Sequence, residues 1–286
     1  MVKTKSKKNT EKREKLILLD AHAIIHRAYH ALPDFATSKG EPTGALYGLV
    51  SMVLKIVTDF DPDYLIACFD LPKPTYRHEV YDAYKAGRVK TDENLSLQLE
   101  KSKEVCSVLN IPIYSKEGFE ADDMLGTIVE QIKNKDIDTI IASGDMDTLQ
   151  LVGGGVQVYT LKKGIHDTVL YNEEKVKERF GFTPSLLPDF KGLRGDPSDN
   201  IIGIEGIGEK TATDLIKEFG GIDDIYKSLN KGMLEGKVKP RIISLLKEGE
   251  EEARFSKMLA TIRRDAPIKF EIPNKKWKEG IDMMKA

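Results

Sequence analysis

Three short apolar runs in the sequence each lead to an aspartate, and this pattern restricts the fold more than any other feature. Residues 16–19 lead to Asp20, residues 64–69 lead to Asp70, and residues 137–142 lead through a Ser-Gly pair to Asp145. Residues 43–59, between the first two runs, have the apolar periodicity of a helix. Short buried strands that alternate with helices predict an α/β fold with a mostly parallel central sheet and flanking helices.

The position of these aspartates also predicts where they meet. In an open α/β sheet, ligands bind at the edge formed by the carboxyl ends of the strands. Asp20, Asp70 and Asp145 are therefore expected at one edge. An aspartate often starts the turn after a strand, so any one of them has this simpler explanation. Three together make that explanation weaker.

Six further carboxylates follow in short clusters: Glu120, Asp122, Asp123, Asp147, Asp196 and Asp199. Glu120 and Asp123 are three residues apart at the start of a helical pattern, so they share one helix face. Asp122 points elsewhere and acts through water or orients its neighbours. The alternative is that acids in a first helical turn serve only the helix dipole.

Nine carboxylates in one place would repel each other unless their pKa values rise or cations bind. Oxygen ligands without paired cysteine or histidine favour Mg²⁺, with Mn²⁺ as a substitute, over zinc. Two such ions, about 3.5–4 Å apart, are the usual apparatus of nucleases and phosphatases.

The rest of the composition is that of a soluble globular protein. The chain has 286 residues, two cysteines and a net charge of −2, and without the nine carboxylates the remainder carries +7. No apolar stretch reaches the length of a membrane span, which predicts a cytoplasmic protein with no membrane partner.

The sequence divides into three segments. Residues 1–15 predict a disordered basic tail, residues 16–180 an α/β domain, and residues 181–286 a helical region. No internal repeat is evident.

Eight ordered motifs resemble those of one family. They are residues 18–20, 67–70, 76–79, 84–88, 120–123, 143–147, 195–200 and 206–212. In these motifs the chain is similar to the 5′-nuclease domain of bacterial DNA polymerase I and to the related flap endonucleases, from about residue 16 to 265. The resemblance implies a PIN-like 5′-nuclease fold and a metal-dependent hydrolase of replication and repair that leaves a 5′-phosphate and a 3′-hydroxyl.

The resemblance also implies a division of the carboxylates. One metal site would use Asp20, Asp70, Glu120, Asp122 and Asp123. The other would use Asp145, Asp147, Asp196 and Asp199. Every one of these positions is acidic in this chain.

Basic and aromatic residues follow Asp70, a mixture suited to single-stranded nucleic acid. The family implies that residues 71–110 form a helical arch above the metals, where Arg77, Lys85 and Arg88 hold phosphates and Tyr84 stacks on a base. Lys85 and Arg88 would then act with Asp20 and Asp70 in catalysis. A solvated amphipathic helix is the alternative for this segment.

A glycine-rich turn within residues 190–220 resembles a helix–hairpin–helix, which grips a duplex backbone. Its expected DNA contacts are Gly206, Gly208, Lys210 and Thr211, since free backbone N–H groups at a helix start suit phosphate. In the family, carbonyls of this turn commonly hold K⁺. The chain has Ile202 and Glu205 where the family often has proline, and Glu205 adds negative charge near the expected phosphates.

These features predict a monomeric, structure-specific 5′-3′ exonuclease or flap endonuclease acting on DNA with a 5′ end or flap. An RNA primer is a further candidate substrate, and the sequence leaves this choice open. One alternative is a phosphatase of the haloacid-dehalogenase type, since residues 145–148 contain its Asp-x-Asp pattern. The other is a catalytically silent binder of DNA junctions.

Overall fold

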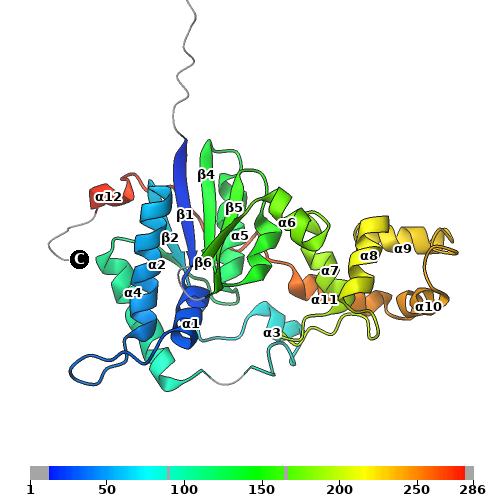
Figure 1. Cartoon of the computed structure of the whole chain (residues 1–286), viewed down its shortest axis with the longest axis horizontal. Helices are drawn as coiled ribbons and strands as arrows, with labels where there is room; N and C mark the ends of the chain where they lie inside the picture. The colour runs from blue at the N-terminus through cyan, green and yellow to red at the C-terminus, as the bar shows by residue number, and fades with distance from the viewer. Residues whose placement is uncertain (1–12, 89–90, 164–166, 281–286) are drawn as a thin grey trace, which may run out of the picture.

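The computed structural model describes residues 13–88, 91–163 and 167–280, which form an α/β part with a helical part at one end (Figure 1). Of the tail predicted at residues 1–15, residues 1–12 lie outside the described residues. The first strand already begins at Glu14, two residues before the expected start of order. Residues 89–90 of the predicted arch also lie outside the described residues.

A six-stranded sheet in the order β3-β2-β1-β4-β5-β6 forms the centre. The strands are β1 (Glu14–Asp20), β2 (Tyr64–Cys68), β3 (Ile113–Tyr114), β4 (Ile137–Ser143), β5 (Val156–Lys163) and β6 (Asp167–Tyr171). The first five are parallel to their neighbours, and β6 pairs antiparallel with β5. The predicted mostly parallel sheet is confirmed.

Helices cover both faces of this sheet. The helices of the α/β part are α1 (Ala21–Ala31), α2 (Gly44–Phe60), α3 (Tyr76–Val80), α4 (Glu93–Val108) and α5 (Ala121–Ile132), with the 3₁₀ helix η1 (Met146–Leu151). Ile17 and Leu19 of β1 pack with α1, α2 and α4, and Leu16 and Leu18 pack with α5. Because both faces are buried, β1 is apolar at successive positions instead of alternating.

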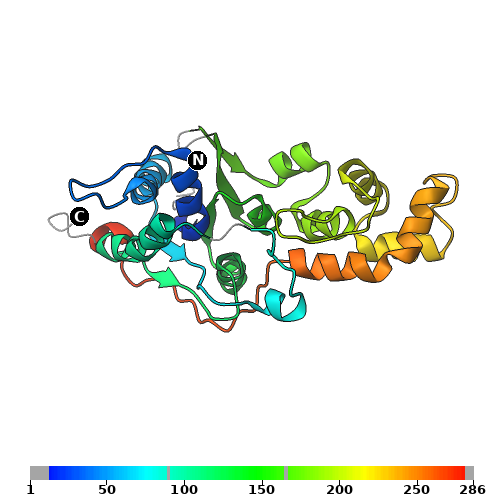
Figure 2. The same cartoon turned by 90° about the horizontal axis from the view of Figure 1, so that it is seen from below.

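The helical part shares a core with the α5 side of the sheet. Its helices are α6 (Glu173–Phe180), η2 (Pro184–Leu186), α7 (Leu187–Arg194), α8 (Glu209–Phe219), α9 (Ile222–Asn230), α10 (Pro240–Glu248) and α11 (Glu250–Ala260). Ile216, Ile225 and Leu246 from this part belong to the same buried cluster as Leu18. The view from below shows α10 and α11 extending away from the sheet (Figure 2).

After α11 the chain returns across the α/β part. The side chain of Gln131 on α5 bonds the backbone of Ile268 and of Phe270, at 2.8 and 2.9 Å. Trp277, in α12 (Trp277–Gly280), is buried and donates its indole N–H to the carbonyl of Leu109 at 2.8 Å. This segment therefore ties the helical part to the α/β part.

Within the described residues, no helix combines the length and the apolar character that crossing a bilayer requires.

Candidate metal centre and nucleic-acid interface

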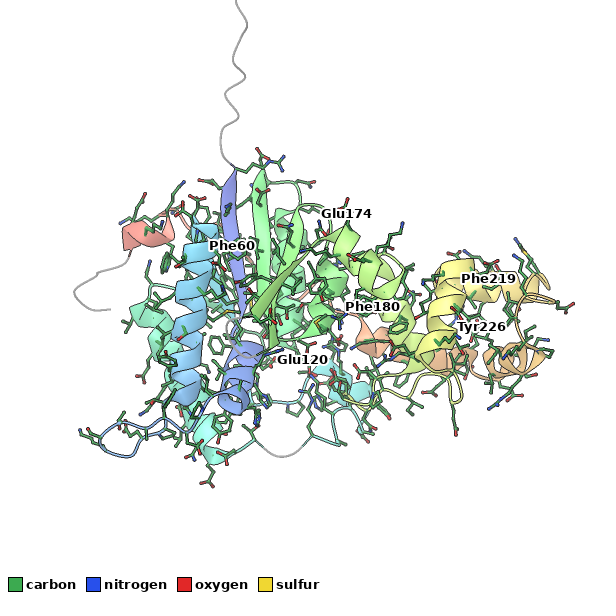
Figure 3. The ribbon with its side chains drawn as sticks, in the orientation of Figure 1. Phe60, Glu120, Glu174, Phe180, Phe219 and Tyr226 are labelled. Atoms are coloured by element: carbon green, nitrogen blue, oxygen red, sulfur yellow. The ribbon has the colours of Figure 1, made fainter. Side chains whose placement is uncertain are left out.

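The parallel sheet brings Asp20, Asp70 and Asp145 to one edge. Asp20 is the last residue of β1 and pairs in register with Cys68 of β2, two residues before Asp70. Asp145 follows β4 by two residues. Asp70 Oδ1 accepts the backbone N–H of Ala121 at 2.6 Å, so the end of β2 is fixed to the start of α5. Figure 3 labels Glu120, which lies at this edge.

Asp20 is buried beneath the sheet edge. Its Oδ2 accepts the Ser143 hydroxyl at 2.6 Å, and its Oδ1 accepts the Ala23 N–H at 3.1 Å as the N-cap of α1. Burial raises the pKa of Asp20 to about 7, and the charges of Asp70 and Asp145 add to this rise, against the hydrogen bond from Ser143. A nearby cation would favour the ionised form. Ser143 was not singled out in the sequence, although it directly follows the third apolar run.

A second acidic group forms from η1 and the turn after α7. Oxygens of Asp147, Asp196 and Asp199 all lie within 4.8 Å of one another. Burial raises the pKa of Asp147 to about 6, while the ammonium of Lys191 opposes the rise. Three close carboxylates in a partly buried setting provide hard oxygen ligands suited to a divalent cation.

Lys191 lies at the middle of this group and was missed in the sequence. Its ammonium bonds both Asp147 and Asp196. Burial opposes its charge, but the two carboxylates outweigh burial and hold the pKa of Lys191 above its usual value. A basic residue in the last turn of a helix usually serves the helix dipole, so its sequence position gave no separate signal.

The acids at the start of α5 have unequal roles. Glu120 and Asp123 form a capping box, in which each side chain accepts the other residue's backbone N–H. Asp123 is fully buried, and its oxygens also accept Arg77 and the N–H of Arg263. The oxygens of Asp123 are thus all engaged in hydrogen bonds, which does not favour the expectation that it binds metal directly.

Asp122 shows the opposite situation. Its Oδ1 is buried and has no hydrogen-bond partner among the described residues. Burial, together with the neighbouring charge of Asp123, raises its pKa well above the usual value. A buried carboxylate oxygen without a partner is costly unless a ligand completes it, so Asp122 remains a candidate ligand, directly or through water.

Arg77 is buried instead of facing a substrate. Its side chain is 2% exposed and donates to Asp123, to Glu120 and to the carbonyls of Leu259 and Thr261. All of these bonds measure between 2.9 and 3.0 Å. This position does not favour the expectation that Arg77 holds DNA phosphates, because its donors already join α3, α5 and the end of α11.

Tyr84 is also buried, at 3% exposure, and this position does not favour the expectation that its ring stacks on a base. Its hydroxyl lies 3.1 Å from Glu120 Oε2 and 3.2 Å from Asp199 Oδ2. It therefore bridges the acids at the start of α5 and the second acidic group. Its ring also packs edge-on against His78.

Lys85 and Arg88 place positive charge beside the same two acids. Lys85 Nζ lies 2.7 Å from Glu120 Oε1, and Arg88 Nη2 lies 2.5 Å from Asp199 Oδ1. Lys85 has a left-handed backbone with φ of 57°, and its N–H donates to the carbonyl of Asp199 at 2.9 Å. The structure thus brings both residues to the carboxylates, and Arg88 remains half exposed.

The glycine-rich turn lies between α7 and α8. Gly206 has a φ of 87°, and Gly208 is the N-cap of α8, whose first turn contains Lys210 and Thr211. Ile204 and Ile207 anchor the turn in the core. Glu205 and Ile202 are exposed, and Glu209 pairs with Arg194 at 3.0 Å.

Two family descriptions together match nearly the whole chain. Residues 15–181 match the 5′-3′ exonuclease N-terminal resolvase-like domain, and residues 182–282 match the 5′-3′ exonuclease C-terminal SAM fold. DNA polymerase I of Caldicellulosiruptor bescii is 40% identical over 267 residues, which are 93% of this chain and 31% of the relative. DNA polymerase I of Bacillus subtilis is 38% identical over 260 residues, 91% of this chain and 29% of the relative. The chain spans about a third of the length of these relatives.

Solved structures agree with this assignment. The bacteriophage T5 5′-exonuclease, determined with zinc bound, superposes with a TM-score of 0.71 at 25% identity, covering 86% of this chain and 89% of that one. Human GEN1, determined with Holliday junction DNA, shares the fold with a TM-score of 0.57 at 16% identity, covering 91% of this chain and 64% of that one. With family descriptions that cover residues 15 to 282, the chain belongs to the 5′-3′ exonuclease family.

Proposed function

We propose that this protein is a structure-specific 5′-3′ exonuclease and flap endonuclease that hydrolyses DNA phosphodiesters with two divalent ions. The observation that carries this proposal is the meeting of two acidic groups with Lys85 and Arg88 at one edge of the sheet. Tyr84 joins the two groups through one hydroxyl. Carboxylates that can bind metal ions, beside positively charged side chains, suit a reaction in which negative charge develops on phosphate oxygens.

The donor set fits Mg²⁺, with Mn²⁺ as a substitute. Asp20, Asp70, Glu120 and Asp122 would hold one ion, and the others would hold the second: Asp145, Asp147, Asp196 and Asp199. The buried, unpartnered oxygen of Asp122 and the raised pKa of Asp20 support a cation at the first group. When bound, the ions polarise the phosphate and lower the pKa of the attacking water.

The remaining residues of the centre hold the carboxylates in place and stabilise negative charge. Ser143 fixes the carboxylate of Asp20, while Tyr84 fixes Glu120 relative to Asp199. Lys85 and Arg88 offer positive charge to the phosphate that undergoes cleavage. Both move from carboxylate to phosphate partners as the substrate enters. Lys191 holds Asp147 and Asp196 together and shares their charge.

The substrate we propose is DNA with a free 5′ end or flap, which passes beneath the arch at residues 71–110. Gly206, Gly208, Lys210 and Thr211 would contact the duplex backbone, with K⁺ held by carbonyls of the turn. An RNA primer paired to DNA fits the same backbone contacts. We further propose that the protein acts as a monomer in the cytoplasm.

The direct test is cleavage of a 5′-flap duplex with Mg²⁺. We expect products with a 5′-phosphate and a 3′-hydroxyl, and no cleavage after EDTA removes the ions. The variant Asp145→Ala/Asp147→Ala should bind the flap and fail to cut it. Equal cutting by this variant, or binding without cutting by the wild type, would overturn the proposal.

The same assay separates the alternatives. A phosphatase of the haloacid-dehalogenase type would hydrolyse small phosphate esters and leave the flap intact. Asp145 follows β4, which is fourth along the chain, whereas that class normally places its Asp-x-Asp motif after the first strand. A silent junction binder would lack acids of the centre, and this chain has all nine.

A further inference from the structure

The helical part contains a 30-residue repeat that is hidden in the sequence. Residues 204–206 read Ile-Glu-Gly and residues 234–236 read Leu-Glu-Gly, while residues 215–218 read Leu-Ile-Lys-Glu and residues 245–248 read Leu-Leu-Lys-Glu. Most of the intervening residues differ between the two copies. In both copies the glycine precedes a helix, α8 in the first and α10 in the second.

The two turns also share one backbone hydrogen bond and a glycine of positive φ. Ile207 N–H donates to Ile204 O at 2.9 Å, and Lys237 N–H donates to Leu234 O at 3.2 Å. Each turn has a buried aliphatic residue first, an exposed glutamate second and a glycine of positive φ third. The φ angles are 87° at Gly206 and 77° at Gly236, as the third position of a type II turn requires. The second turn therefore repeats the hydrogen bond and the glycine of the first, with one further bond from Val238 N–H to Leu234 O at 2.9 Å.

The two turns differ in charge. Residues 201–211 contain Glu205 and Glu209 against the single cation Lys210. Residues 231–241 contain four cations, Lys231, Lys237, Lys239 and Arg241, against the single acid Glu235. Lys237 pairs with Glu218 at 2.7 Å, whereas Lys231, Lys239 and Arg241 are exposed without an ion pair in the part of the chain that the structure describes. The charge suited to phosphates lies on the second copy.

The second copy also lies beside the first. A Cβ built on Gly206 would come within 3.1 Å of Leu245 and 3.9 Å of the Arg241 guanidinium. Lys237 reaches Glu218 at the far end of α8, whose eleven residues span about 16 Å. In Figure 1, α10 and the chain leading into α8 lie toward the same lower side as α3.

We propose that the turn at residues 234–237, with Lys239 and Arg241, is a second contact for the phosphate backbone of the duplex. This inference rests on the proposed nuclease function. It resolves the charge deficit of the first hairpin. The first copy presents its backbone to the duplex, and the second supplies side-chain cations beside it, with the Arg241 guanidinium 3.9 Å from a Cβ built on Gly206. The contact carries no base recognition, because lysine and arginine at a backbone read charge and spacing.

The test is equilibrium binding of a 5′-flap duplex across a salt series, without divalent ions so that no cleavage occurs. We compare the wild type with Lys239→Ala/Arg241→Ala. At about 100 mM salt, loss of two phosphate contacts should weaken binding about tenfold, and the slope of log K against log salt should become shallower by about 2.

Lys135→Ala/Lys177→Ala is the matched control, since both lysines are exposed and lie after α5 and on α6, outside the arch and the proposed surface. It should bind as the wild type does. A double variant of Lys239 and Arg241 with unchanged affinity and salt slope would overturn the second contact. Cleavage by the wild type is scored separately with Mg²⁺. If the wild type fails to cleave while the variant still weakens binding, the nuclease proposal falls and the contact stands.

Discussion

The guanidinium of Arg77 donates two parallel hydrogen bonds to the carboxylate of Asp123, Nη1 to Oδ2 and Nη2 to Oδ1, each 2.9 Å long. Both side chains are buried, and Arg77 also bonds the carbonyls at the end of α11. The pair therefore fixes the start of α5 to the helical part. It stabilises the frame that carries Glu120 without itself touching the substrate.

Arg77→Ala should destabilise the protein strongly, because it leaves the carboxylate of Asp123 buried without its partner. Loss of one member of a buried pair typically costs about 3–5 kcal/mol. Urea unfolding measures this loss. Lys73→Ala, which breaks the exposed pair with Glu117, is the control and should leave the unfolding midpoint near the wild type. Normal stability with lost DNA affinity in Arg77→Ala would restore the phosphate-binding role.

Tyr84→Phe separates two roles for this side chain. It keeps the ring, so a stacking role would leave cleavage intact, whereas removal of the hydroxyl breaks the bridge between Glu120 and Asp199. We expect the single-turnover cleavage rate to fall about tenfold or more, since misplaced acids lose catalytic alignment. DNA affinity should change little. A wild-type rate in this variant would contradict the bridge.

Lys85→Ala should lower the cleavage rate far more than duplex affinity, because its ammonium lies beside Glu120 within the acidic centre. A positioned donor to transition-state charge is commonly worth about 10²–10³ in rate. Single-turnover rates and binding anisotropy on one flap substrate provide the comparison. An equal fall in rate and affinity would instead make Lys85 a general binding residue.

The raised pKa of Asp20 predicts a pH dependence of stability without metal. Burial raises this pKa from 3.8 to about 7, so the folded protein holds the proton more tightly than the unfolded chain. Stability from this group is present at low pH and is lost as pH rises from about 4 to about 7. Divalent ions bind the ionised carboxylate, so Mg²⁺ should raise the melting temperature more at about pH 7.5 than at about pH 5.5.

Asp20→Asn is the control for this pH effect, because it removes the titrating group. In the absence of Mg²⁺, the melting temperature of the variant should differ less between the two pH values than that of the wild type. If the wild type and this variant show the same pH dependence, the ionisation of Asp20 is not responsible.

Much of the centre follows from the sequence because parallel strands deliver their ends to one edge. That rule places Asp20, Asp70 and Asp145 together before any coordinates are known. The roles of Arg77, Tyr84 and Asp123 do not follow in the same way. Each lies in a motif that resembles a substrate-binding or metal-binding segment, and only tertiary packing shows that each is buried with its polar atoms already bonded.

Lys191 and the second turn were missed for related reasons. A single lysine near a helix end has many explanations, and only the fold brings it between Asp147 and Asp196. The second turn shares few residues with the first, and its identity lies in backbone angles at Gly206 and Gly236. Neither signal is present in local periodicity or composition.

The central claim is that two groups of carboxylates at one sheet edge each hold a divalent ion. Counting bound Mn²⁺ by electron paramagnetic resonance, with a 5′-phosphorylated duplex product present, tests it most directly. The account predicts two ions per wild-type chain and one in Asp147→Asn/Asp196→Asn, which removes charge from the second group alone. A single ion in the wild type, or two in the variant, would contradict the claim.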